Sequence, residues 1–255
     1  MNVRHIRCGA AAGLLCATGA WASAPVAVYP SGSSVPENLL RIEIRLQVPL
    51  RAPLDMSHVK LLDGAGRVIE GAFLDLPLPS ADGRRLSILL HPGRVKSGVG
   101  ANLALGRALQ AGAAVTLVID DPAIGPAVSK SWQVTGFDGR RPLPSRWTVI
   151  SPAAGTRQPL LVRLHSPLSV SSEALIAVKR ANGRRLPGRG LLMDGETTWR
   201  FTPAQPWQSG AHVLVAHPDL ETPEGNRPCA PFEAVEASQI DCDAGFERVF
   251  DVRRR

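Results

Sequence analysis

The sequence predicts an all-β protein in which two tandem β-sandwich domains follow a cleavable export signal. A strand motif occurs twice in the chain, short runs alternate apolar with polar residues, and turn-forming residues separate these runs. The 255 residues include 22 prolines and 24 glycines, and both residue types favour turns. Many short strands at regular spacing indicate stacked antiparallel sheets, because the helical spacing of parallel α/β units is missing from the pattern.

The strand motif marks two copies of one structural unit. Residues 44–50 have the sequence Ile-Arg-Leu-x-x-Pro-Leu, and residues 162–168 have Val-Arg-Leu-x-x-Pro-Leu. Further segments match in the same order along the chain: 59–67 with 176–184, 82–92 with 194–203, and 112–118 with 210–216. Similarity that persists over a whole unit is the signature of an internal repeat. The main disagreement is an insertion in the first copy, over residues 93–110.

The amino-terminal segment 1–22 has the features of a signal peptide. Arg4 and Arg7 precede an apolar run of small residues, and Ala20-Trp21-Ala22 then forms a typical cleavage site. The apolar run is shorter than the roughly 20 residues of a membrane-spanning helix. A lipid anchor on Cys16 is the weaker alternative, since the bulky Leu15 precedes that cysteine. We therefore expect an exported chain without a transmembrane segment after cleavage.

The repeat divides the remaining chain into a first domain over 26–135, a linker over 136–146 and a second domain over 147–252. The two domains are of ordinary size. The linker is rich in Gly, Arg and Pro, and its prolines limit how freely the domains swing.

Several segments carry clear strand patterns. Leu40–Leu46 and Thr198–Thr202 alternate strictly, which places apolar side chains on one face and polar ones on the other. Trp132–Val134 is expected to close the first domain, and Val249–Val252 the second. Turn signals such as Asp82-Gly83 separate the runs.

Two cysteines, Cys229 and Cys242, remain after removal of the signal. An even number of cysteines in an exported chain predicts a disulfide. It would close a polar loop before the last strand, which in the chain-entropy model contributes about 3 kcal/mol. A metal site is the weaker alternative, because no Cys-x-x-Cys pair or nearby histidine accompanies them.

The charge of the chain argues against a nucleic-acid partner. The 29 basic and 22 acidic residues give a net charge of +7, and loss of Arg4 and Arg7 with the signal lowers it. Part of the remainder lies in the terminal run Arg253-Arg254-Arg255. Nucleic-acid binding calls for a concentrated basic face with stacking aromatics, and only 5% of the residues are aromatic.

The strand and turn pattern resembles a known family. A turn, a strand ending in Pro-Leu, a Gly-Arg hairpin, a Gly-led strand and then Asp219-Leu220-x-x-x-x-Gly225-Asn226 are similar to the bacterial Ig-like domain of the S-layer SbsA type. The resemblance implies two tandem immunoglobulin-like β-sandwiches, used in exported bacterial proteins as spacer, adhesion or accessory modules, with no catalytic residues and no cofactor. The second copy matches best. The first departs at Asp120-Asp121-Pro122, where the Asp…Gly-Asn turn is expected, and in its insertion.

Catalytic motifs are missing from the sequence. It has no Gly-x-Ser-x-Gly elbow, no His-Glu-x-x-His helix and no phosphate-binding glycine loop, so we do not expect an enzyme. Asp219, Glu221 and Glu224 could hold Ca²⁺, but an acid that opens a tight turn is ordinary turn chemistry. Copper carriers of the CopC type share a related sandwich and use a histidine at the mature amino end, where this chain would have Ser23.

The insertion 93–110 is the most distinctive candidate for binding. Arg94 and Lys96, with Arg84 and Arg85 nearby in sequence, would suit an acidic partner or an anionic glycan. A helical flap that covers the end of the sandwich with Leu105 and Leu109 is the alternative and is favoured.

Trp207 is a second candidate. If exposed, its indole could stack on a sugar, but a loop tryptophan between Pro and Gly more often closes the edge of a sandwich.

Together these observations predict a non-enzymatic structural, adhesion or protein-binding module, located in the periplasm or at the cell surface, whose partner is another envelope or surface protein. The alternative is an accessory protein that binds a glycan or a metal ion.

Overall fold

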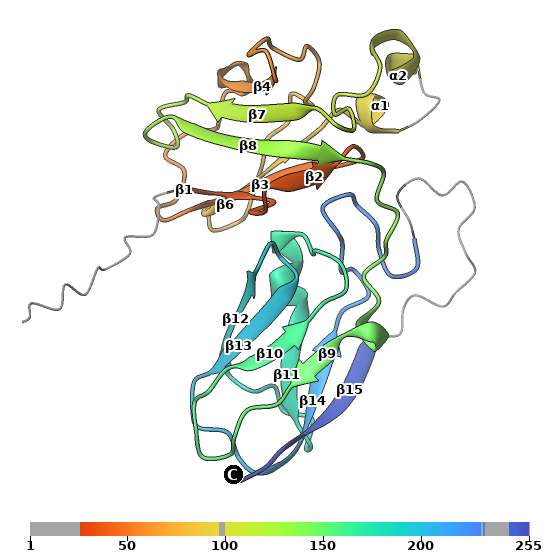
Figure 1. The fold of residues 1–255 in the computed structure, drawn as a ribbon. Coiled ribbons are helices and arrows are strands. Elements are labelled where there is room, and N and C mark those ends of the chain that lie inside the picture. Colours follow the sequence, from red (N-terminus) through yellow and green to blue (C-terminus); the bar gives the residue numbers. More distant parts are fainter. Residues whose placement is uncertain (1–25, 97–99, 231, 233–244, 255) are drawn as a thin grey trace, which may run out of the picture.

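The computed structural model describes residues 26–96, 100–230, 232 and 245–254, which form two β-sandwiches joined by a short linker (Figure 1). The predicted signal peptide lies outside the described residues. Each sandwich consists of two sheets packed face to face around its own hydrophobic core.

The first sandwich packs one four-stranded sheet against another. The first sheet has the order β1-β3-β6-β5, and its strands are Val26–Tyr29, Arg41–Leu46, Arg85–Leu89 and Leu78–Pro79. The second has the order β2-β8-β7-β4, and its strands are Ser34–Pro36, Val128–Thr135, Ala114–Ile119 and Val59–Asp63. A 3₁₀ turn, η1 (Met56–His58), precedes β4. All pairs are antiparallel except β2 with β8.

The second sandwich repeats this layout. Its first sheet has the order β9-β10-β13-β12, with strands Thr148–Ile150, Leu160–Arg163, Thr198–Pro203 and Gly188–Met193. Its second has the order β11-β14-β15, with strands Ile176–Arg180, Gly210–Ala216 and Phe246–Val252. The 3₁₀ segments are η2 (Pro144–Arg146) in the linker and η3 (Val170–Leu175) before β11.

The strand order confirms the predicted fold class of two tandem immunoglobulin-like β-sandwiches. In immunoglobulin domains, strands A, B, E and D form one sheet and C, F and G the other. In the second sandwich β9-β10-β13-β12 and β11-β14-β15 follow this arrangement. In both copies the first strand also changes sheets: β2 pairs in parallel with β8, and Ala153 makes a parallel bridge to Arg253.

The repeat found in the sequence is a structural repeat. The two copies of the motif form β3 and β10, which occupy the same position in their sheets. Ile44 and Val162, at the head of each copy, are fully buried. Burial of such a side chain contributes about 1.5–3 kcal/mol, so alternating apolar residues from both sheets hold each sandwich together.

The insertion forms two short helices, α1 (Pro92–Val95) and α2 (Gly100–Leu105), beside the first sandwich. The predicted helical flap is correct in part. Leu109 is buried in the core of the first sandwich, but Leu105 is 61% exposed and is not part of that core. The reason is the turn at Gly106, whose φ of 72° changes the direction of the chain between the two leucines.

Candidate functional site: the joint and cleft between the domains

The outer face of β3 is covered by the second domain. Strict alternation predicts that this polar face contacts water, but Arg41 forms an ion pair with Glu221 at 2.5 Å and Arg45 with Glu173 at 3.1 Å. Glu43 is only 6% exposed. Its carboxylate accepts hydrogen bonds from the backbone amides of Val170 and Ser171, which begin η3.

A second contact joins the start of the first domain to a turn of the second. Ser31 donates to the Glu196 carboxylate from its hydroxyl at 2.6 Å and from its amide at 3.0 Å. Glu196 has a φ of 62°, a left-handed backbone that is uncommon outside glycine. Burial raises the pKa of Glu196 above its ordinary value, although both bonds from Ser31 oppose this effect. The hydrogen bonds from Ser31 thus stabilise the left-handed backbone at Glu196.

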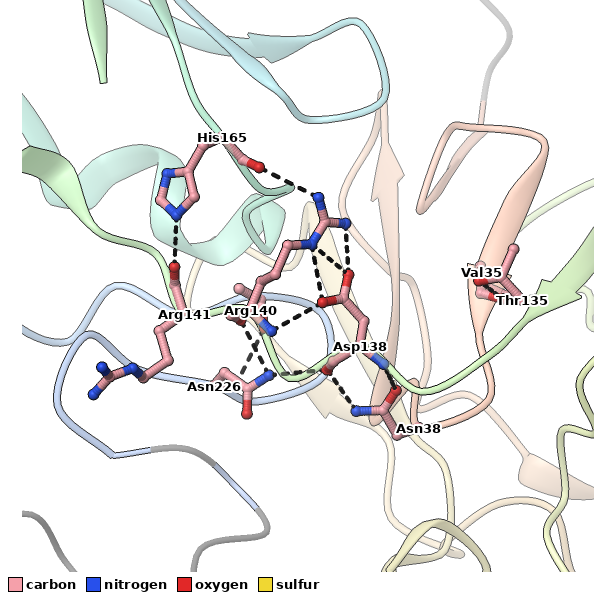
Figure 2. Close-up of polar contacts among 9 residues, drawn as sticks. Val35, Asn38, Thr135, Asp138, Arg140, Arg141, His165 and Asn226 are labelled. Atoms are coloured by element: carbon pink, nitrogen blue, oxygen red, sulfur yellow. Dashed lines mark hydrogen bonds and ion pairs between the residues drawn. The ribbon is translucent and has the colours of Figure 1, made fainter. Parts of the chain in front are cut away.

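The linker is fixed between the two domains by its own Asp138 (Figure 2). Asn38 of the first domain donates to the Asp138 carbonyl and accepts from its amide, both at 2.8 Å. Asn226 of the second domain donates to the same carbonyl at 3.3 Å. Burial tends to raise the pKa of Asp138, but hydrogen bonds from Arg140 prevail and lower it.

Arg140 and Arg141 extend this network to His165, which follows β10. Arg140 binds the Asp138 carboxylate at 2.6 Å and donates to the carbonyl of His165 at 3.3 Å. The Nε2 atom of His165 lies 2.9 Å from the carbonyl of Arg141. The backbone course of the linker is therefore set by side chains from both domains (Figure 2).

The turn considered for Ca²⁺ is a docking element. The carbonyl of Pro223 accepts from the amides of Leu40 at 3.1 Å and Arg41 at 3.2 Å. Asp219 and Glu221 both pair with Arg227, so their charges are compensated by arginine. The part of the chain that the structure describes contains no group of three side chains suited to a metal ion.

A cleft of about 1120 Å³ lies beside this joint, lined by residues of β1, β3 and β6 in the first domain and of β12 in the second. Its charged residues are mostly arginines. Those of the first domain are Arg45, Arg84 and Arg85, and those of the second are Arg185 and Arg189. Two acidic residues, Asp82 and Glu173, also line the cleft. The excess of arginine makes this cleft suited to an anionic group.

The wall of the cleft in the second domain includes two glycines and two aromatic rings. Gly188 and Gly190 of β12 lie against the rings of Phe201 and Trp199, where side-chain carbons would otherwise stand. A Cβ atom on Gly190 would lie 2.7 Å from the Nε1 atom of Trp199. This buried indole N–H has no hydrogen-bond acceptor among the described atoms.

The predicted binding residues fall into two groups. Arg84 and Arg85 lie together in the cleft. Arg94 is buried, donates to the carbonyl of Gly106 at 2.7 Å and to that of Glu70, and holds the insertion in place. The buried position of Arg94 thus favours a structural role over contact with a partner. The ammonium of Lys96 lies 4.3 Å from the centre of the Phe232 ring, away from the cleft arginines.

Trp207 is not a surface platform. Its side chain is 2% exposed, packs among Phe201, His212 and Phe250, and donates its N–H to the carbonyl of Gln158 at 2.7 Å. The hypothesis of an exposed sugar-stacking tryptophan is wrong, because the ring fills the end of the second core.

The remaining predictions concern segments that the structure describes only in part. Cys242 lies outside the described residues, so its disulfide with Cys229 stays a prediction. Within the ranges that are described, no helix has the length and apolar character needed to cross a membrane.

Comparison with known proteins gives structural neighbours only. No family model and no curated protein matches the chain. Among solved structures it is similar to the BSP domain of a biofilm associated protein, at 12% identity and a TM-score of 0.24, covering 72% of this chain and 26% of that one. The chain thus spans about a quarter of that neighbour.

Two further neighbours are matched over most of their length. Tandem immunoglobulin domains of titin match at 11% identity and a TM-score of 0.26, over 84% of this chain and 87% of theirs. The Rst D1-D2 pair matches at 8% identity and a TM-score of 0.24, over 85% and 91%.

Proposed function

We propose that this chain is an exported, non-enzymatic protein-binding module of the bacterial envelope, in which two immunoglobulin-like domains hold a basic cleft in a fixed shape. The observation that carries the proposal is the arginine-lined cleft of about 1120 Å³ built from both domains. Its two walls are kept in register by the ion pairs of Arg41 and Arg45 and by the buried Glu43. A module of this kind would act in adhesion or as a structural connector to another envelope or surface protein.

Export and the disulfide belong to the same proposal. Cleavage after Ala22 would give a mature chain that starts at Ser23 and is located in the periplasm or at the cell surface. Oxidation there would join Cys229 to Cys242. Mass spectrometry of the protein recovered from fractionated cells tests both points: we expect an amino terminus at Ser23 and a disulfide-linked peptide pair that separates on reduction. A cytoplasmic, uncleaved chain would contradict the proposal.

Binding through the cleft is tested by site-specific photo-cross-linking in the native cells. A photoreactive amino acid replaces Arg189 in the cleft or, as a control, the exposed Arg146 of η2, which lies outside it. We expect one recurrent protein adduct from position 189 and none from position 146. Equal labelling from both positions, or none from position 189, would refute a protein-binding cleft.

Glycan binding is the second candidate, and the same cleft favours it. The four cleft arginines that form no ion pair among the described residues, Arg84, Arg85, Arg185 and Arg189, could hold the acidic groups of an anionic glycan without any contribution from the protein backbone. Binding of a sulfated oligosaccharide in preference to any peptide would select this alternative.

A further inference from the structure

Strand β12 is an edge strand whose outer side faces the cleft. It pairs with β13 on one side, where Ala204 donates to the carbonyl of Pro187 at 2.9 Å. On the other side the amide of Leu192 donates to the Glu173 carboxylate at 2.9 Å. Backbone groups alternate in direction along a strand, so the N–H and C=O groups of Gly188 and Gly190 point the same way as the Leu192 amide.

The open part of this edge is short and has defined ends. The amide of Leu186 is bonded to the carbonyl of Val178 at 2.7 Å, and that of Leu192 to Glu173. Between them Gly188 and Gly190 present donors and acceptors that have no partner on this side among the described residues. Such an edge is a template for an added strand, and glycine permits close approach of another backbone.

Arginines surround this opening. Arg185 and Arg189 are exposed and form no ion pair within the described part of the chain. Arg85 lies across the cleft in the first domain. Because an incoming strand would carry its side chains past these cations, acidic side chains are favoured and basic ones are repelled.

Glu173 already shows how a carboxylate binds here. One carboxylate accepts from the Leu192 amide at 2.9 Å and from Arg45 at 3.1 Å. An acidic residue beside Gly188 or Gly190 would meet the same combination of an edge amide and an arginine.

The indole of Trp199 supplies an independent indication of a ligand. Its buried N–H lies beside Gly190, lines the cleft and lacks an acceptor among the described atoms. A buried donor without a partner costs about 1–3 kcal/mol, so such groups call for an explanation. This donor lies on the face of β12 toward which a side chain at position 190 would point.

We propose that the edge of β12 at Gly188–Gly190 binds an extended acidic segment of a partner protein as an added β-strand. This inference rests on the proposed function and names the chemistry of the partner. A peptide is favoured over an anionic glycan because the opening offers alternating backbone donors and acceptors as well as arginines, and a strand matches both.

The test uses the purified mature protein and a short fluorescein-labelled peptide that alternates glutamate with valine. Fluorescence anisotropy should detect binding that weakens at least about tenfold, or about 1.4 kcal/mol, in the variant Arg185→Glu/Arg189→Glu. The matched charge reversal Arg146→Glu should leave affinity within about twofold. A lysine–valine peptide should not bind. Failure of the acidic peptide to bind would overturn the inference.

Hydrogen exchange separates strand addition from simple anion binding. The amides of Gly188 and Gly190 should exchange at least about tenfold more slowly in the complex, because they become ladder donors. Three results would overturn strand addition: no protection of these amides, equal binding of a peptide interrupted by proline, or stronger binding of heparin. Each of them points to an anion or glycan site instead.

The protein-binding function and the strand-addition inference can be refuted independently of each other. A cross-linked protein adduct at position 189 without binding of the acidic peptide would refute the strand-addition inference and leave the protein-binding function standing. Peptide binding in solution without any adduct in cells would refute the function in the cell.

Discussion

At the scale of single residues, Glu224 is a buried carboxyl group whose ionisation opposes folding. It is buried in the turn that docks on the first domain. Burial is the largest effect and raises the pKa of Glu224 from 4.5 to about 7, although hydrogen bonds from Thr222 and its own amide, together with Arg140, act against it. The folded state therefore favours the protonated form.

This shift predicts how stability depends on pH. A raised pKa means that the contribution of Glu224 to the free energy of unfolding is fully present below about pH 4.5 and is lost as pH rises through about 7. The shift corresponds to about 3 kcal/mol. Urea unfolding at pH 5 and pH 8 should show that Glu224→Gln removes most of this difference. The exposed Glu247→Gln is the control and should keep it; equal pH dependence in all three proteins would contradict the prediction.

Gly190 is required by close packing. Its missing side chain makes room for Trp199, since a Cβ atom would lie 2.7 Å from Nε1 and 2.8 Å from Cε2 of the indole. We expect Gly190→Ala to lower the free energy of unfolding by about 1–3 kcal/mol, as overpacking does. Gly136→Ala, where the new carbon meets nothing within 4 Å, should change it by less than about 0.5 kcal/mol. Denaturation followed by tryptophan fluorescence compares the two, and equal stabilities would disprove the packing argument.

At the scale of elements, alternation predicted the strands but not what covers their outer faces. The pattern of Leu40–Leu46 correctly places Ile42 and Ile44 in the core. A charged residue on the opposite face has the same pattern whether it meets water or another domain, so the burial of Glu43 could not be inferred. The two acids that pair with Arg41 and Arg45 are far from them in sequence, which left no local signal.

The insertion is a second case in which the sequence did not predict the contacts of a charged side chain. Its basic, glycine-rich sequence suggested a binding loop, but Arg94 donates to the carbonyl of Gly106 in the insertion and to that of Glu70 outside it. Composition gives the charge of a side chain but does not show which groups lie near it in the folded protein. The cleft could be predicted only in part, through Arg84 and Arg85, because its other wall comes from the second domain.

Arg94 therefore has a testable structural role. Arg94→Ala removes a buried donor to the carbonyls of Gly106 and Glu70 and leaves a cavity. We expect the free energy of unfolding to fall by about 2–3 kcal/mol. Arg51→Ala, at an exposed arginine of the same domain, should have little effect. Thermal unfolding measures both; a stable Arg94→Ala protein that loses a partner would restore the binding hypothesis.

At the scale of the whole molecule, three sets of side-chain contacts among the described residues hold one domain against the other, in addition to the backbone bonds to Pro223. The three sets are the ion pairs and buried carboxylate on β3, the bond between Ser31 and Glu196, and the linker network around Asp138. Each uses charged or polar groups, which are common where domains of one chain meet. A cleft with walls from two domains keeps its shape only while these contacts persist, so the joint and the proposed binding function are coupled.

The linker network predicts a measurable protection from protease. Asn38→Ala removes both bonds between Asn38 and the Asp138 backbone, which together are expected to contribute about 1–3 kcal/mol. Opening of the linker should rise about tenfold or more, and trypsin cleavage after Arg140 should rise with it when cleavage tracks the open population. Timed digestion with mass spectrometry of the products gives the rate.

Asn182→Ala is the matched control, because among the described residues the Asn182 side chain bonds locally, to the amide of Arg184 in a surface turn that is far from the linker in sequence. Its cleavage rate after Arg140 should equal that of the unmodified protein. If Asn38→Ala also left this rate unchanged, the hydrogen bonds to Asp138 would not be what fixes the linker, and the ion pairs on β3 would have to hold the cleft in shape without it. The double variant Asn38→Ala/Glu43→Gln then shows whether the linker bonds and the β3 contacts act independently. If they do, their effects on linker opening should add. If the joint is a single cooperative unit, loss of either one should open it fully.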